Sequence, residues 1–129
     1  MTVEYVSWKA GDSKIKPAPL TIKPKTWTLL TFDEGDAITP KNDGVANWAY
    51  YVNVNKNGGA EKLELRWIRE PAGIKDFTGA RTLDLKLDNI HSGVWIFKAK
   101  KGQPVGIQVY HAGATDMVIT TRECKLWIP

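Results

Sequence analysis

The last third of the chain constrains the fold most strongly, because apolar residues occupy every second position in two short runs of it. These residues are Val105, Ile107 and Val109 in the first run, and Cys124, Leu126 and Ile128 in the second. A period of two places every second side chain on one face of a β-strand, so that this face can enter a core. Turn-forming clusters at 101–104 and 112–116 precede and follow the first run. The stretch 93–129 therefore predicts three or four strands, the last of which holds the C-terminal residues in a sheet.

Strand patterns of the same kind recur upstream, from residue 26 onward. They occupy residues 27–32, 48–55, 62–67 and 82–87. The run 27–32 is apolar on both faces, which predicts a central strand. Helical periodicity is absent, and Gly or Pro interrupts almost every candidate helix. About eight short strands separated by turns predict an all-β antiparallel sandwich, of either jelly-roll or immunoglobulin-like type.

The composition is that of one ordinary globular domain. The sequence has 129 residues, of which 43% are hydrophobic and 25% are charged. Its apolar runs are far shorter than the roughly 20 residues that span a bilayer, and its first residues lack the apolar block of a signal peptide. We therefore expect a protein that is neither inserted in a membrane nor secreted through a signal peptide. The single cysteine excludes an internal disulfide.

Residues 1–25 differ from the rest of the chain in composition. Gly and three prolines interrupt any regular element, with one short strand expected around Val3–Trp8. Its part from Lys9 to Lys25 holds five lysines against one acid, Asp12, whereas basic and acidic residues are equal in number in the rest of the chain, so this part carries the whole net charge of +4. We predict an extended basic arm over residues 1–25, followed by a β-sandwich domain over residues 26–129.

The arm is the predicted attachment site for a partner. Lysine-rich segments attract anionic surfaces over about a Debye length. Nucleic acid is disfavoured as the partner, because no arginine cluster or ladder of interleaved aromatic residues accompanies the lysines. A solvated arm, or an arm laid on the acidic surface of a neighbouring subunit, fits better. The residues expected to make the contact are Trp8, Lys9, Lys14, Lys16, Lys23 and Lys25.

Catalytic patterns do not emerge from the sequence. The only two histidines are His91 and His111, and Cys124 is in phase with Leu126 and Ile128, which predicts an inert thiol in the core. No serine lies in a nucleophile-elbow motif. The sequence therefore predicts a protein that is not an enzyme.

Complete metal-binding or cofactor-binding motifs are also absent from the sequence. The acidic segment 32–40 has three carboxylates but lacks the spacing of a calcium loop. The segment 73–79 begins and ends with Gly but lacks the Gly-Lys-Ser/Thr ending of a phosphate loop, and no helix is predicted after it. We expect both segments to be turns between strands, and we expect no metal and no cofactor.

Six tryptophans and four tyrosines are many for this chain length. Trp27 and Trp67 are in phase with aliphatic neighbours and are expected in the core. Trp127 and Tyr110 are out of phase with theirs and are expected to point outward. Together with Trp95 they form the predicted outer face, for which two uses stay open. One is a contact between subunits, and the other is stacking against sugar rings in a carbohydrate-binding module.

Two segments resemble those of C1q-like and tumour-necrosis-factor-like jelly rolls. Lys100–Val109, with its Gly-Gln-Pro-Val-Gly-Ile-Gln-Val core, resembles the entry of a late strand in that family, and Asn47–Val54 resembles an earlier aromatic-rich strand. The resemblance extends over residues 27–129 and implies a jelly roll. Small trimeric modules of this kind also decorate the heads or form the fibre tips of bacteriophages.

The resemblance and the residue patterns together give one expected function. We expect a non-enzymatic structural protein that forms a homotrimer and attaches through its N-terminal arm to a larger assembly, such as a phage capsid or tail. Its expected location is then the virion, assembled in the host cytoplasm. The alternative is a carbohydrate-binding β-sandwich whose partner is a glycan.

Overall fold

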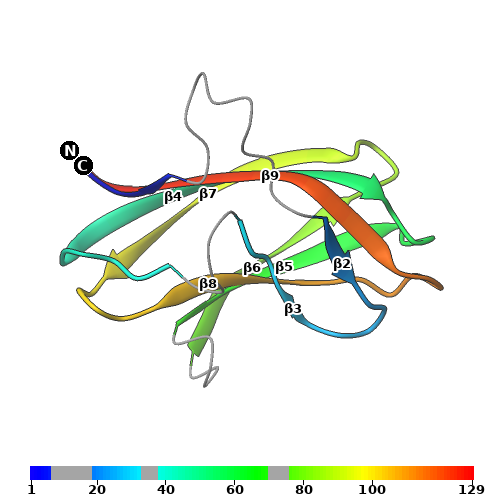
Figure 1. Cartoon of the computed structure of the whole chain (residues 1–129), viewed down its shortest axis with the longest axis horizontal. Coiled ribbons are helices and arrows are strands. Elements are labelled where there is room, and N and C mark those ends of the chain that lie inside the picture. Colours follow the sequence, from blue (N-terminus) through cyan, green and yellow to red (C-terminus); the bar gives the residue numbers. More distant parts are fainter. Residues whose placement is uncertain (7–18, 33–37, 70–75) are drawn as a thin grey trace.

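The fold is known from a computed structural model that describes residues 1–6, 19–32, 38–69 and 76–129 (Figure 1). In these residues the regular structure consists entirely of β-strands, which pair antiparallel. The strands are β1 Thr2–Val6, β2 Leu20–Ile22, β3 Thr28–Leu29, β4 Gly44–Lys56, β5 Lys62–Arg69, β6 Asp76–Asp84, β7 Ile90–Ala99, β8 Val105–Tyr110 and β9 Met117–Ile128.

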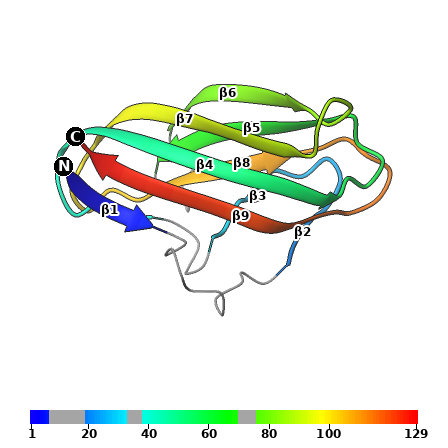
Figure 2. The same ribbon diagram turned by 90° about the horizontal axis from the view of Figure 1, so that it is seen from above.

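The strands form two sheets that lie face to face as two layers (Figure 1). In the first, here called the β9 sheet, the order is β1-β9-β4-β7, and β2 also pairs with β9. In the second, the β8 sheet, the order is β3-β8-β5-β6. Because β1 pairs antiparallel with the end of β9, residues Thr2 and Ile128 are neighbours, and the two ends of the chain lie together (Figure 2). The predicted all-β antiparallel sandwich is confirmed.

The core lies between the two sheets and follows the period-two pattern. Along β4 the inward residues are buried and the outward ones are half-buried or exposed. Trp48 of β4 and Trp67 of β5 are the largest fully buried side chains, and Phe97 of β7 packs against both. Burial of such side chains contributes about 1.5–3 kcal/mol each, which makes this apolar layer the main source of stability.

The two apolar runs of the final third lie in the core as predicted. Val105, Ile107 and Val109 point into the core from β8, and Leu126 does so from β9. Cys124 is also buried in this core. Strand β9 pairs with β4 along most of its length, and on its other side it pairs with β1 and β2 near its two ends. It is therefore the central element of its sheet.

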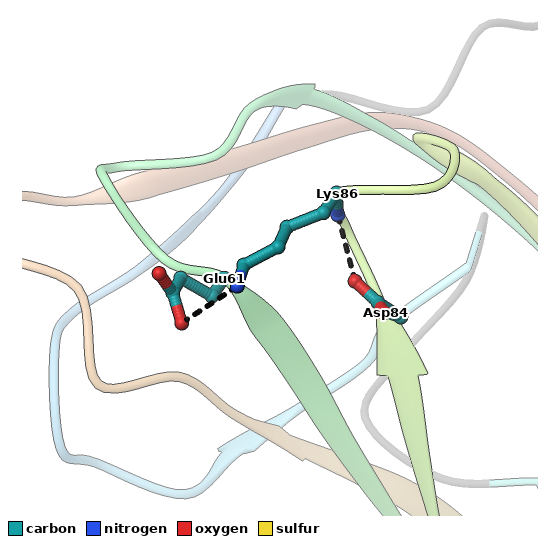
Figure 3. A network of polar contacts seen from close by, with 3 residues as sticks. All are labelled: Glu61, Asp84 and Lys86. Atoms are coloured by element: carbon teal, nitrogen blue, oxygen red, sulfur yellow. Dashed lines mark hydrogen bonds and ion pairs between the residues drawn. The ribbon is translucent and has the colours of Figure 1, made fainter.

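Two strand predictions are wrong in extent or position. The run 27–32 contributes only the two-residue strand β3, which is at the edge of the β8 sheet rather than in its centre. Strand β6 ends at Asp84, where the Asp84 carboxylate accepts a 2.9 Å hydrogen bond from the Lys86 backbone N–H (Figure 3). The chain turns there, and Leu87, predicted as a strand residue, is 85% exposed. An exposed ion pair at 3.4 Å joins Lys86 in this turn to Glu61, which lies just before β5, and it adds little stability (Figure 3).

The segment 1–25 was expected to be a detached arm, but its described residues are built into the sandwich. Strands β1 and β2 both pair with β9, and the side chain of Ile22 is fully buried in the core. The imidazole of His111, which is buried, bonds the Ile22 carbonyl oxygen at 2.7 Å and accepts a bond from the Gly113 N–H at 3.1 Å. His111 therefore ties β2 to the loop that follows β8, and both of its ring nitrogens have partners.

A buried arginine joins the two sheets on the same side of the sandwich. Arg122 of β9 donates hydrogen bonds to the carbonyl oxygens of Ile119 and Thr120, at 3.0 and 3.1 Å, and to that of Thr31, which follows β3. Desolvation by burial lowers the pKa of its guanidinium from the ordinary value. Hydrogen bonds to a charged donor are the stronger kind, so this side chain fixes the chain after β3 against β9.

Candidate interaction surface

The outer side of the β9 sheet is the most apolar exposed surface among the described residues. Five large hydrophobic residues on β1, β4 and β7 are between 45% and 71% exposed there. Their direction follows from alternation, because Ala46, Trp95 and Phe97 beside them point into the core. Together with Trp127 they are here called the outer apolar face, which consists of Val3, Val45, Ile90, Val94, Ile96 and Trp127.

Strand register brings residues of this face together in one row of the sheet. Asn47 of β4 lies between Ile96 of β7 and Trp127 of β9, and Trp127 in turn lies opposite Val3 of β1. One row of the sheet therefore carries three apolar side chains across four strands. Residues directly opposite one another on neighbouring strands have side chains in contact range, so Trp127 and Val3 are neighbours, and Ile96 lies on the same side of the sheet across Asn47.

Lysines accompany the apolar residues on this side of the sheet. Lys98 lies opposite Val45, and the ammonium of Lys125 lies 5.4 Å from the centre of the Trp127 ring. Glu123 lies on the same side, opposite Tyr51. A surface with an apolar centre and charged side chains around it has the composition of a protein interface.

The three aromatic residues predicted to share one outer face do not do so. Trp95 points inward, where it is buried and stacks on Tyr50 with 4.7 Å between ring centres. Its placement on an exposed face was wrong, because Trp95 has the same phase along β7 as the buried Phe97. Tyr110 and Trp127 do point outward and are half-buried, but Tyr110 is on the β8 sheet and Trp127 is on the β9 sheet.

Tyr110 belongs to a cluster on the outer side of the β8 sheet that the sequence patterns did not reveal. The guanidinium of Arg66 lies 4.0 Å from the centre of the Trp27 ring, and Trp27 contacts Tyr110 at 5.2 Å. Arg66 Nε also donates a 2.7 Å hydrogen bond to Gln108 Oε1. Trp27 was expected in the core, yet it is half-buried on this outer side. The sequence does contain one indication of this cluster: Gln108 and Tyr110 alternate with the core residues Ile107 and Val109, so both point to the outer side of the strand.

This cluster does not provide a flat platform for a sugar ring. The planes of Trp27 and Tyr110 are inclined at 37°, and Arg66 covers one face of the Trp27 ring. Desolvation lowers the pKa of Arg66 from its ordinary value, but an arginine remains a cation throughout the range in which proteins fold. Sugar binding on aromatic side chains needs open and nearly parallel ring faces, so the geometry does not favour the carbohydrate-binding alternative.

The predicted arm residues are only partly placed. Trp8, Lys9, Lys14 and Lys16 lie outside the described residues. Lys23 and Lys25 are exposed near β2, at the side of the sandwich where β2 meets the loop after β8.

Groups of three or more potential metal ligands are absent from the part of the chain that the structure describes. The two histidines have structural partners, since the His91 ring bonds the Asp88 carbonyl oxygen at 2.7 Å and His111 is held as described above. The described residues also contain no helix long and apolar enough to cross a membrane.

Comparisons with known proteins show the fold and leave the family open. No protein-family model matches the sequence, and no curated protein matches it. Among solved structures, the chain is similar to the globular domain of a zebrafish complement 1qA protein, with 14% identity and a TM-score of 0.50 over 85% of this chain and 95% of that one. At this identity the likeness concerns the fold alone. The chain is an all-β sandwich with the jelly-roll arrangement of C1q-like domains.

Proposed function

We propose that the chain is a non-enzymatic structural module that associates with copies of itself through the outer apolar face. The observation that carries this proposal is the distribution of exposed apolar side chains. Five of the seven large hydrophobic residues exposed in the described structure lie on one side of one sheet. Exposed apolar patches of this kind mark surfaces that bind other proteins.

The energy available from covering this face is substantial. Full burial of a Val or Ile side chain contributes about 1.5–3 kcal/mol, so a residue that is half exposed can still contribute roughly 1 kcal/mol. Five such residues and Trp127 offset a large part of the cost of fixing two subunits, which is about 4–15 kcal/mol. In a trimer, one part of this face contacts a different part of the same face on the next copy, and a heterologous contact of this kind gives a closed symmetric ring when its rotation closes.

The proposed assembly is a homotrimer, and its proposed place is a virion, as a decoration of a phage capsid or a module of a tail or fibre. The trimer and the virion come from the resemblance of the two sequence segments to C1q-like modules that have these properties. The jelly-roll arrangement of the two sheets supports this comparison. An exposed apolar side of the β9 sheet supports the association of subunits.

The self-association is tested by a pair of matched substitutions. Ile96→Lys places a charge in the outer apolar face at its most exposed residue, whereas Leu87→Lys makes the same kind of change at an exposed apolar residue in the turn after β6. We expect Ile96→Lys to give a monomer in size-exclusion chromatography with light scattering. Leu87→Lys should keep the mass of the parent protein. Equal masses for the two variants would contradict the proposal that this face forms the contact between subunits.

Attachment of the module to the larger assembly is proposed to use the lysines of residues 9–16. Deleting residues 1–25 would also remove β1 and β2 and the buried Ile22, so it cannot test the lysines alone. A variant with Lys9, Lys14 and Lys16 changed to Glu leaves these strands in place. Its control carries three exposed lysines elsewhere changed to Glu, at positions 41, 56 and 100. Quantitative mass spectrometry of purified virions should show reduced occupancy for the first variant only, and equal occupancy would exclude the proposed attachment.

A further inference from the structure

Strand β7 is an exposed edge with a sequence that favours pairing. It is the last strand of the β9 sheet and pairs only with β4 among the described strands. Its central residues, 94–97, are Val-Trp-Ile-Phe, which are β-branched or aromatic and carry no charge. Edge strands of this composition are templates for adding a strand of another chain. The fold therefore needs something that keeps this edge unpaired.

Arg81 reaches this edge from the other sheet. It lies on β6, opposite Leu65 of β5, whose side chain is fully buried, so Arg81 also points between the sheets. Its Nη2 donates a 2.5 Å hydrogen bond to the carbonyl oxygen of Val94, and its Nη1 donates a 3.2 Å bond to the hydroxyl of Tyr50. One side chain thus connects the edge strands β6 and β7 of the two layers.

The position of the guanidinium is fixed by its surroundings. It lies 4.7 Å from the centre of the Trp95 ring, which is itself stacked on Tyr50. Gly93 provides the room, because a Cβ at this position would lie 2.6 Å from Arg81 Nη1 and 2.5 Å from the Tyr50 hydroxyl. Two hydrogen bonds, a cation–π contact and a glycine therefore hold the charge at one point of the edge.

The Val94 carbonyl is one of the groups that an added strand would use. It accepts its bond from Arg81, which is not part of the β9 sheet, so it points away from β4 and toward the open edge. A strand added at this edge would have to displace the guanidinium from this oxygen or cover the charge. Covering a charge without a compensating partner is costly, and charges that point inward are a known protection of sheet edges.

We propose that Arg81 keeps the β7 edge from pairing with an edge strand of a second copy of the chain. This inference is independent of the proposed function, because edge pairing extends the sheet in its own plane. Association through the outer apolar face would instead place the second subunit on the outer side of the β9 sheet, out of the plane of the sheet. The two processes also differ in product, since pairing of the β7 edge with a different edge strand of the next copy, such as β1, repeats without limit and gives aggregates, whereas a closed ring has a fixed mass.

The test compares two arginine variants of matched chemistry. Arg81→Met keeps a long apolar side chain near Trp95 and removes the charge and its donors. Arg69→Met makes the same change on β5, an inner strand of the β8 sheet, where Arg69 lies 4.8 Å from the Trp67 ring and donates a 2.9 Å bond to Gln103. Aggregation is followed by light scattering and thioflavin fluorescence in native buffer, and the unfolded fraction of each variant is measured by urea titration.

At equal unfolded fraction, Arg81→Met should aggregate about tenfold faster than Arg69→Met, because only the former opens an edge. Adding Ser92→Lys to Arg81→Met should slow aggregation again, since Ser92 is exposed on the same edge strand and like charges repel across an added strand. Equal rates for the two arginine variants, or no slowing by Ser92→Lys, would overturn the proposal.

A third variant covers the case in which Arg81→Met does not fold. Arg81→Lys keeps a charge at the edge but cannot hold the Val94 carbonyl and the Tyr50 hydroxyl in the planar two-point geometry of a guanidinium. It should aggregate faster than the parent protein. Its rate should stay below the rate expected for Arg81→Met, which is about ten times that of Arg69→Met. A rate no higher than that of the parent protein would contradict the role of the Val94 bond.

Discussion

A glycine at the turn between β4 and β5 gives the sharpest quantitative prediction. Gly58 has a φ of +67°, and its carbonyl oxygen accepts a 3.1 Å bond from the Thr115 N–H in the loop before β9. A Cβ on Gly58 would lie 2.4 Å from the Thr115 carbonyl oxygen and 2.8 Å from that of Asp116. These are backbone atoms, so they cannot move aside as the end of a side chain can.

The change Gly58→Ala therefore has two costs. The left-handed conformation costs an alanine about 1–2 kcal/mol, and overlap with fixed atoms costs about 1–3 kcal/mol. We expect a loss of roughly 2–5 kcal/mol in the free energy of unfolding from the two effects together. This loss is measured by urea denaturation followed by tryptophan fluorescence.

Gly102 separates the two costs. Its φ is +81°, and a Cβ there would meet nothing within 4 Å. Gly102→Ala should therefore lose only the conformational part, about 1–2 kcal/mol. Gly59 is a second control of the same kind, since it also has a φ of +81° and its Cβ would meet only Ala114 N, at 3.7 Å. If Gly58→Ala and Gly102→Ala lose the same free energy within about 0.5 kcal/mol, the overlap argument is refuted.

Two further substitutions probe buried polar groups. Arg122→Met should reduce the free energy of unfolding by about 2–4 kcal/mol, because it leaves the carbonyl oxygens of Thr31, Ile119 and Thr120 without this donor. The loss is measured by urea titration. A loss below about 1 kcal/mol would contradict the contribution of these hydrogen bonds to stability. Trp67→Phe should cost less than about 2 kcal/mol, compared with about 3–5 kcal/mol for Trp67→Ala, because the buried Trp67 Nε1 has no acceptor among the described residues. Equal losses for the two Trp67 variants in thermal denaturation would contradict this reasoning.

The period-two pattern predicted the fold where only one face of a strand is apolar. Val105, Ile107 and Val109 are an example, and they are all in the core. The pattern failed where both faces are apolar, as in Val94–Phe97. There, alternation shows that Trp95 and Phe97 share a face, but it does not show which face enters the core. The exposed partners Val94 and Ile96 are as apolar as the buried ones, so only packing against the second sheet decides.

Contacts between distant parts of the chain were not predictable from local patterns. Strands β1 and β2 are short, and prolines precede and follow β2, so the segment 1–25 had the composition of an arm. Its place in the sheet comes from pairing with β9, at the other end of the chain. The roles of Arg81 and Arg122 depend in the same way on backbone carbonyls from distant segments. The outer apolar face likewise became visible only when register placed Val3, Ile96 and Trp127 in one row.

The mass of the protein in solution tests the central claim most directly. The claim is that the outer apolar face of the β9 sheet joins copies of the chain into a trimer. Sedimentation equilibrium at tens of micromolar should give three times the chain mass of 14.4 kDa. It should give a single chain mass for Ile96→Lys under the same conditions. A parent protein with the mass of one chain at this concentration would contradict the account.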